Sequence, residues 1–112
     1  MEANNDRKLP AGRPLELAGL VDYQQGAVVS RTIIHRPVGT VTLFAFDREQ
    51  GLSEHTAPYD ALVYALEGEA QVVISGESRR LQAGQVLLMP AHEPHSLHAL
   101  QQFKMLLVMI RS

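Results

Sequence analysis

The residues best suited to chemistry are five histidines in a chain of 112 residues that contains no cysteine. Two of them stand beside turn signals: His55 lies between Gly51 and Pro58, and His95 directly follows Pro94. Near neutral pH an imidazole can bind a metal ion or act as a general base. Because cysteine is absent, thiolate chemistry, disulfides and cysteine-ligated zinc are excluded, and any metal is expected to use nitrogen and oxygen ligands.

These histidines lie in or next to short apolar runs that are separated by glycine or proline. Runs of this length, with β-branched and aromatic residues and turn residues between them, predict the strands of an all-β domain. The last run contains Met105 and Met109 four residues apart, a spacing that also suits a helix, but no helix cap lies nearby and a strand is favoured. The predicted strands are 20–23, 27–35, 40–46, 61–66, 70–75, 78–81, 86–89, 95–99 and 103–110.

Three landmarks follow one another in the second half of the chain. They are Leu-Glu-Gly-Glu at 66–69, Leu-Gln-Ala-Gly at 81–84, and a segment that runs from Met-Pro to Pro-His over 89–95. In this combination and spacing, residues 26–110 resemble a small single-domain cupin of the RmlC-like type. The resemblance implies an all-β double-stranded β-helix, a jelly-roll barrel of two antiparallel sheets. We therefore expect one domain, with residues 1–19 as a flexible leader and strap and residues 20–112 as the barrel.

The resemblance also implies where a metal would bind. Metal-loaded cupins use two histidines and a glutamate from the first motif and one histidine from the second. Position by position these ligands fall on His55, Ala57, Ala61 and His95, so two of the four are missing. Two imidazoles alone make a weak site for zinc or iron.

Other residues near these positions could complete the set. His92, in the turn before His95, is the best candidate for a third ligand. Asp60 precedes the vacant glutamate position, so a regular strand turns it to the opposite face unless a bulge rotates it inward, and it also suits a turn. His98 is expected to point away from the site. We therefore expect His55, His95 and His92 to be the ligands of a divalent metal, if one is bound: Zn, Fe, Mn or Ni.

Alanine at the two vacated positions leaves room for a ligand. If side chains alternate along each strand, the walls of the pocket are Ala57, Ala61, Val63, Leu97 and Ala99. An apolar pocket with a few polar groups is the usual form of a small-molecule site. The methionines at 89, 105 and 109 are expected mainly to fill the core, although methionine also suits a pocket that adapts to its ligand.

Composition excludes several classes of partner. The formal net charge is −2, so no overall basic field would attract nucleic acid or an anionic membrane. Neither a signal-peptide pattern nor an apolar run long enough to span a membrane is recognisable, which predicts a cytoplasmic protein. Runs such as 41–46 and 105–110 are apolar on both faces. A neighbouring chain would cover such a face, and we expect a homodimer.

Three classes of function remain open. Binding of a small organic ligand in the barrel, with or without a divalent metal, needs only the pocket and is the interpretation that we favour. A metal-dependent enzyme of dioxygenase or isomerase type would use His55 and His95 with a third ligand to orient and polarise its substrate. A metal-free enzyme would use one imidazole as a general base and the other as its charge partner.

Overall fold

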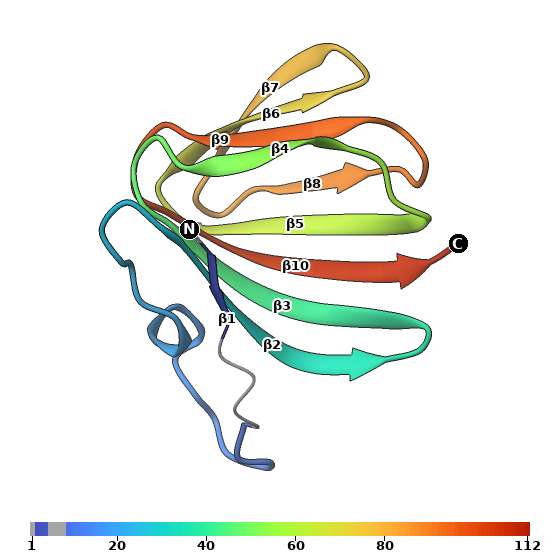
Figure 1. Cartoon of the computed structure of the whole chain (residues 1–112). Coiled ribbons are helices and arrows are strands. Elements are labelled where there is room, and N and C mark those ends of the chain that lie inside the picture. Colours follow the sequence, from blue (N-terminus) through green and yellow to red (C-terminus); the bar gives the residue numbers. More distant parts are fainter. Residues whose placement is uncertain (1, 5–8) are drawn as a thin grey trace.

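A computed structural model describes residues 2–4 and 9–112 and shows two β-sheets that face each other across a common core (Figure 1). The elements in chain order are β1 (Glu2–Asn4), the 3-10 turn η1 (Leu17–Leu20), β2 (Val28–Arg36), β3 (Gly39–Phe46), β4 (Gly51–His55), β5 (Tyr59–Glu67), β6 (Glu69–Ile74), β7 (Glu77–Gln82), β8 (Val86–Met89), β9 (His95–Ala99) and β10 (Phe103–Arg111). The all-β prediction is confirmed, and the last apolar run is a strand.

The strand order shows how residues distant in the sequence meet. One sheet has six strands in the order β1-β2-β3-β10-β5-β8, and the other has four in the order β4-β9-β6-β7. Apart from the parallel pair β1 and β2, neighbouring strands are antiparallel. This arrangement agrees with the jelly-roll barrel that the resemblance implies.

Alternation along β5 explains how the six-stranded sheet faces the core. Ala61, Val63 and Ala65 are at most 3% exposed, whereas Leu62 and Tyr64 between them are 40% and 37% exposed. In a strand, successive side chains point to opposite faces, so the first three pack inward against the second sheet. The largest side chains fully buried in the molecule are Phe46, Phe103, Leu43, Met105, Val63 and Val72.

Gly68 makes the tight connection between β5 and β6 possible. Its φ is +78°, in the left-handed region, and a Cβ at this position would collide with the backbone carbonyl of Gln102. Only glycine adopts this conformation at such close approach without strain. The Leu-Glu-Gly-Glu landmark therefore marks a real backbone constraint.

Residues 9–27 are here called the N-terminal segment, and side chains of residues 17–23 within it pack on the outer face of the six-stranded sheet. The strand predicted at 20–23 is wrong: η1 ends at Leu20, and Val21 packs instead on Leu43 and Ala45 from the sheet's outer face. Side chains hold this backbone in place of a strand partner, because Lys104 Nζ donates to the carbonyl oxygen of Ala18 at 2.6 Å and an Arg31 nitrogen to that of Leu20 at 3.0 Å.

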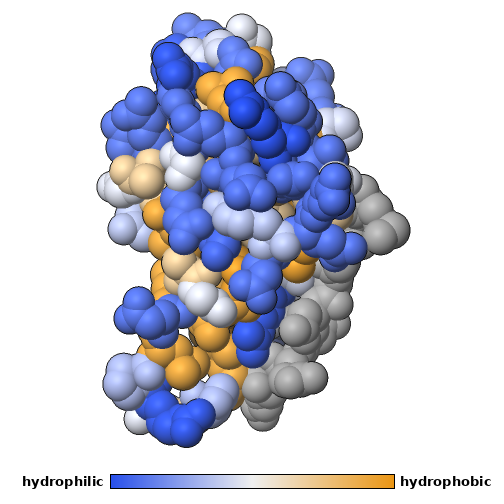
Figure 2. Space-filling model, turned by 90° about the vertical axis from the view of Figure 1, so that its left-hand side faces the viewer, coloured by the Kyte–Doolittle hydropathy of each residue, from blue (hydrophilic) through white to orange (hydrophobic). Residues whose placement is uncertain are grey.

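Figure 2 shows the side of the molecule where this segment lies. Hydrophobic residues gather mainly in the lower half, and the upper half is mostly hydrophilic apart from a small hydrophobic patch near the top (Figure 2). Of the expected leader, residues 2–4 pair with β2, whereas residues 1 and 5–8 lie outside the described residues. The division of the chain at residue 19 stays a prediction.

Within the described part of the chain, no helix is long and apolar enough to cross a membrane.

Candidate functional site

Strand β4, which the sequence did not predict, brings the two motif histidines together. It pairs with β9 at the edge of the four-stranded sheet, and its last residue, His55, lies directly opposite His95, the first residue of β9. Its side chains Gly51 to His55 are exposed or half-buried, so no apolar alternation marks it as a strand. Forty positions separate the two histidines in sequence, and the pairing of β4 with β9 places them next to each other in space.

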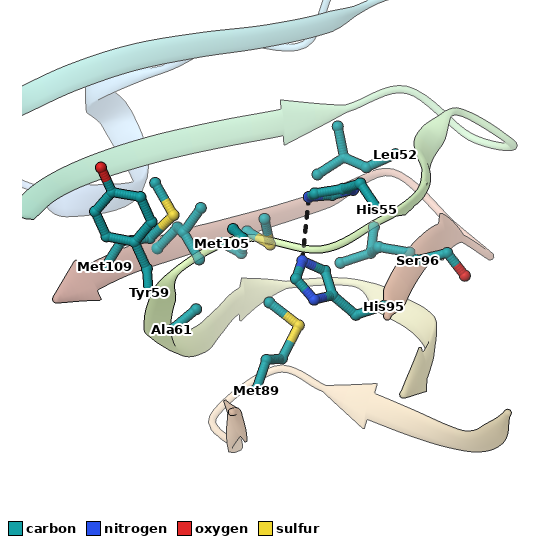
Figure 3. A pocket seen from close by; sticks show the side chains of 12 residues that line it. Leu52, His55, Tyr59, Ala61, Met89, His95, Ser96, Met105 and Met109 are labelled. Carbon is teal, nitrogen blue, oxygen red and sulfur yellow. Dashed lines mark hydrogen bonds between the residues drawn. The ribbon is translucent and has the colours of Figure 1, made fainter. Parts of the chain in front are cut away.

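The two imidazole rings touch through their Nε2 atoms. These atoms are 3.1 Å apart, and the rings meet edge to face at 71° with centroids 4.3 Å apart (Figure 3). Each Nδ1 faces a backbone carbonyl oxygen two residues earlier: 2.7 Å from Ser53 for His55, and 3.1 Å from Glu93 for His95. The backbone therefore orients both rings.

These contacts determine what the pair presents to a ligand. A carbonyl oxygen only accepts, so each Nδ1 carries its hydrogen, and in a neutral ring Nε2 is then an acceptor. Two neutral rings in this tautomer direct lone pairs at each other. A contact of 3.1 Å between them is favourable when a proton, a ligand donor or a cation lies at the junction. Burial lowers the pKa of His95 even though the hydrogen bond to the Glu93 carbonyl acts to raise it. The lowered pKa favours the neutral form of the ring.

A small apolar cavity adjoins the pair. Its volume is about 50 Å³. About 10–15 Å³ of a cavity measured in this way is enough for one water molecule, so the cavity accommodates a few water-sized groups, such as a small organic group of a few atoms. The residues that line it are Leu52, His55, Ala57, Tyr59, Ala61, Met89, His95, Ser96, Leu97, Met105, Leu107 and Met109.

Three of the five predicted wall residues line this cavity: Ala57, Ala61 and Leu97. Val63 and Ala99 do not, and both are 0% exposed. They point inward as alternation predicts, but each lies two residues further along its strand, where the two sheets close on each other. Alternation gives the face of a side chain, not its depth in the barrel.

Sequence reasoning did not assign the methionines to the site. Met89 on β8 and Met109 on β10 are both directly opposite Ala61 on β5, so the three form one row across the sheet. Residues opposite each other on neighbouring strands share a face, and their Cβ atoms are about 5 Å apart. Both thioethers therefore border the space above the alanine methyl group. On β10, the spacing of Met105 and Met109 already placed them on one face, but not opposite Ala61.

The other predicted ligands lie elsewhere. His92 is exposed, has a φ of +68°, and is not among the lining residues; its backbone N–H donates to the carbonyl of Ala57 at 2.9 Å. Asp60 is exposed and accepts a hydrogen bond from the Ala91 N–H at 3.0 Å. These two bonds hold the loop before His95 against the start of β5. His98 is exposed and pairs with Glu49, as its outward direction predicts.

The described residues contain no group of three or more histidine, aspartate or glutamate side chains that could hold a metal ion. The cavity offers two imidazole nitrogens and no carboxylate. Zinc, iron and manganese prefer three or more nitrogen or oxygen ligands from the protein. This donor set fits the predicted divalent metals poorly.

The chain resembles known proteins over most of its length. A family model described as a cupin domain matches residues 42–111. A conserved protein of unknown function from Streptococcus pyogenes is 35% identical with a TM-score of 0.90, over 100% of this chain and 96% of that one. A cupin superfamily protein from Desulfitobacterium hafniense is 30% identical with a TM-score of 0.89, over 96% and 99%. No match was found among curated proteins.

A third solved structure is part of a larger protein. The cupin 2 conserved barrel domain protein from Leptotrichia buccalis is 35% identical with a TM-score of 0.84. The match covers 87% of this chain and 47% of that chain. The same barrel therefore occurs both alone and within a longer polypeptide.

Proposed function

The chain belongs to the cupin family, and from the geometry of its barrel we propose that it binds a small organic ligand at His55 and His95. The observation that carries this proposal is the 3.1 Å contact between two Nε2 atoms whose rings are both oriented by carbonyls. A hydroxyl or ammonium group that lies beside both nitrogens would donate a hydrogen to one of the lone pairs and relieve their repulsion.

The cavity volume limits the ligand's size. Drug-sized ligands occupy pockets of roughly 300–1,000 Å³, whereas this cavity holds about 50 Å³. The ligand therefore has one donor group and an apolar body of a few atoms. A larger body requires the flexible methionine side chains to move aside, a change to which methionine is well suited.

The proposal does not extend to an enzymatic reaction. The dioxygenase or isomerase considered from the sequence needs a third ligand besides His55 and His95, and His92 lies outside the cavity lining. The homodimer and the cytoplasmic location also stay predictions.

A thermal-shift series tests the proposal. The probes are acetic acid, isopropanol, phenol and methylamine with their short homologues, each applied to the untagged protein. A ligand that binds only the folded state raises apparent stability by about 2.7 kcal/mol at a hundred times its Kd. We expect at least one probe to raise the melting temperature of the natural protein but not of His55→Ala or His95→Ala.

His98→Ala is the matched control, because this exposed histidine points away from the cavity and pairs with Glu49. The control should respond like the natural protein. If every probe leaves the melting temperature unchanged, or if the shift persists in both cavity variants, the proposed function is wrong.

A further inference from the structure

We propose that the ligand is a short hydroxy acid, whose hydroxyl group lies at His55 and His95 and whose carboxylate lies at Arg111 on the rim of the cavity. This inference rests on the proposed function, because it names the chemical class of the ligand at the same site. It follows from the position of one arginine, which sequence reasoning did not assign to the site.

Strand β10 turns Arg111 toward the cavity. Met105, Leu107 and Met109 line the cavity, and side chains two residues apart on a strand share a face. Arg111 is the next residue in this series, and it is directly opposite Tyr59 on β5, which also lines the cavity. The guanidinium follows the same direction, because its Nη1 donates to the Tyr59 hydroxyl oxygen at 3.4 Å and its central carbon lies 5.8 Å from the centroid of the ring.

Two backbone hydrogen bonds fix the main chain at this point of the rim. The Arg111 N–H donates to the carbonyl of Val38 at 2.8 Å, and the Ser112 N–H donates to that of Pro58 at 3.0 Å. The guanidinium itself belongs to an exposed residue. The side chain is therefore anchored at its base and free to adjust to a ligand at its tip.

Arg111 lacks an anionic partner. Among the described residues no carboxylate forms an ion pair with it, and the Tyr59 hydroxyl is the one hydrogen-bond partner of its guanidinium. Asp60 follows Tyr59 on β5, so it points to the opposite face, and it accepts the N–H of Ala91. A guanidinium has five N–H donors in a planar fork, and a carboxylate accepts two of them side by side. A carboxylate on the ligand therefore complements this rim.

The end of the ligand inside the cavity is uncharged. None of the twelve lining residues is an aspartate or glutamate, so an ammonium group there would be a charge in an apolar space without an anionic partner, which is costly. A hydroxyl donates to a lone pair on His55 or His95 and brings no charge. The histidine pair therefore favours a hydroxyl group, and Arg111 favours the carboxylate.

The volume limits the length of the ligand. Since one water-sized group needs about 10–15 Å³, a cavity of about 50 Å³ holds roughly three to five such groups, which corresponds to a hydroxyl oxygen with two or three carbon atoms. Figure 3 shows the histidine pair toward one side of the lining residues and Tyr59 toward the other in that view. The carboxylate then lies outside the cavity, at the rim. The compounds 3-hydroxypropanoate and 4-hydroxybutanoate have these proportions.

The test is isothermal titration of the untagged natural protein with 3-hydroxypropanoate, 4-hydroxybutanoate and the methyl ester of each. The ester keeps the hydroxyl group and the carbon chain but removes the charge. We expect at least one acid to bind at least tenfold more tightly than its ester. Arg111→Gln should abolish this preference and leave the affinity for the ester unchanged. An ester that binds the natural protein as tightly as its acid, or a preference that persists in Arg111→Gln, would overturn the proposal.

Arg36→Gln is the matched control. Arg36 is at the same end of the six-stranded sheet, since it is opposite Gly39, which is itself opposite Ile110. Its guanidinium donates to the carbonyl of His35 and not to Tyr59. This variant removes the same charge and should keep the preference for the acid. An equal loss of preference in both arginine variants would show a general effect of charge and would refute the assignment to Arg111.

The outcomes separate this inference from the proposed function. If acids and esters bind equally well and His95→Ala weakens both, the cavity binds an organic ligand and only the carboxylate assignment is refuted. If the thermal-shift probes bind but neither hydroxy acid does, the hydroxy acid is again refuted alone. If no organic probe binds in either measurement, the proposed function fails and this inference fails with it.

Discussion

Ala61→Val tests whether the space beside the histidine pair is a true cavity. Ala61 is 3% exposed, lies within β5, and faces Met89 and Met109 across the sheet. Valine adds two carbon atoms, each about the size of a water molecule, and a cavity of about 50 Å³ has room for them because about 10–15 Å³ of such a cavity is enough for one water molecule. Valine also suits a strand, because its branched side chain packs well on a pleated surface.

The expected gain follows from the buried area. Each buried CH₂ contributes about 0.8 kcal/mol, so two contribute up to about 1.6 kcal/mol to the free energy of unfolding. A gain of about 1 kcal/mol raises the melting temperature of a small domain by roughly 4 to 8 °C. Chemical denaturation should show a higher midpoint with an unchanged m-value, which indicates that stability alone has changed. The same variant should lose ligand binding, because the methyl groups occupy the site.

Ala65→Val is the matched control. Ala65 is on the same strand and the same face, but it is 0% exposed and does not line the cavity. Two added methyl groups have no space there, and overpacking a filled core costs about 1 to 3 kcal/mol. If Ala61→Val destabilises the protein as much as Ala65→Val does, no usable space lies beside Ala61, and the argument for a binding site beside the histidine pair is refuted.

Three further predictions concern the rest of the molecule. Hydrogen bonds from the backbone of Gly26, the side chain of Gln102 and the backbone of Arg48 lower the pKa of Asp47 from its ordinary 3.8. The contribution of Asp47 to stability is therefore present above that pH and lost as the pH falls through the lower folded value. Urea unfolding should show that Asp47→Asn is more destabilising at pH 7 than near pH 2, and an equal loss at both would contradict this. Leu62 and Leu88 are paired neighbours that are 40% and 58% exposed, and we expect them in the dimer interface. Light scattering at micromolar concentration should give twice the chain mass for the natural protein and the mass of a single chain for the double variant Leu62→Glu with Leu88→Glu. A monomeric natural protein would contradict the dimer. Gly68→Ala should cost more than about 3 kcal/mol and Gly76→Ala only about 1 kcal/mol, since both have positive φ but only the first alanine would meet a backbone carbonyl; equal losses on denaturation would argue against the close approach.

Local signals in the sequence were sufficient for most of the strands. Glycine at 68, 76 and 84, each with positive φ in the structure, separated short runs rich in β-branched and aromatic residues, and this pattern predicted the all-β class. The same signals failed for residues 20–23, which look like a strand but are held by side chains from the sheet. They failed for β4 as well, because an exposed edge strand carries no apolar alternation.

The candidate site, too, was predicted from the sequence only in part. The sequence by itself determined that His55 and His95 fall on two of the four ligand positions that the cupin resemblance implies, that alanine stands at 57 and 61, and that no cysteine is available. Only the tertiary structure decided that the Nε2 atoms lie 3.1 Å apart and that Met89 and Met109 border Ala61. The physical reason is that residue type and alternation are local properties, whereas these contacts depend on the register of strands that are distant in the chain.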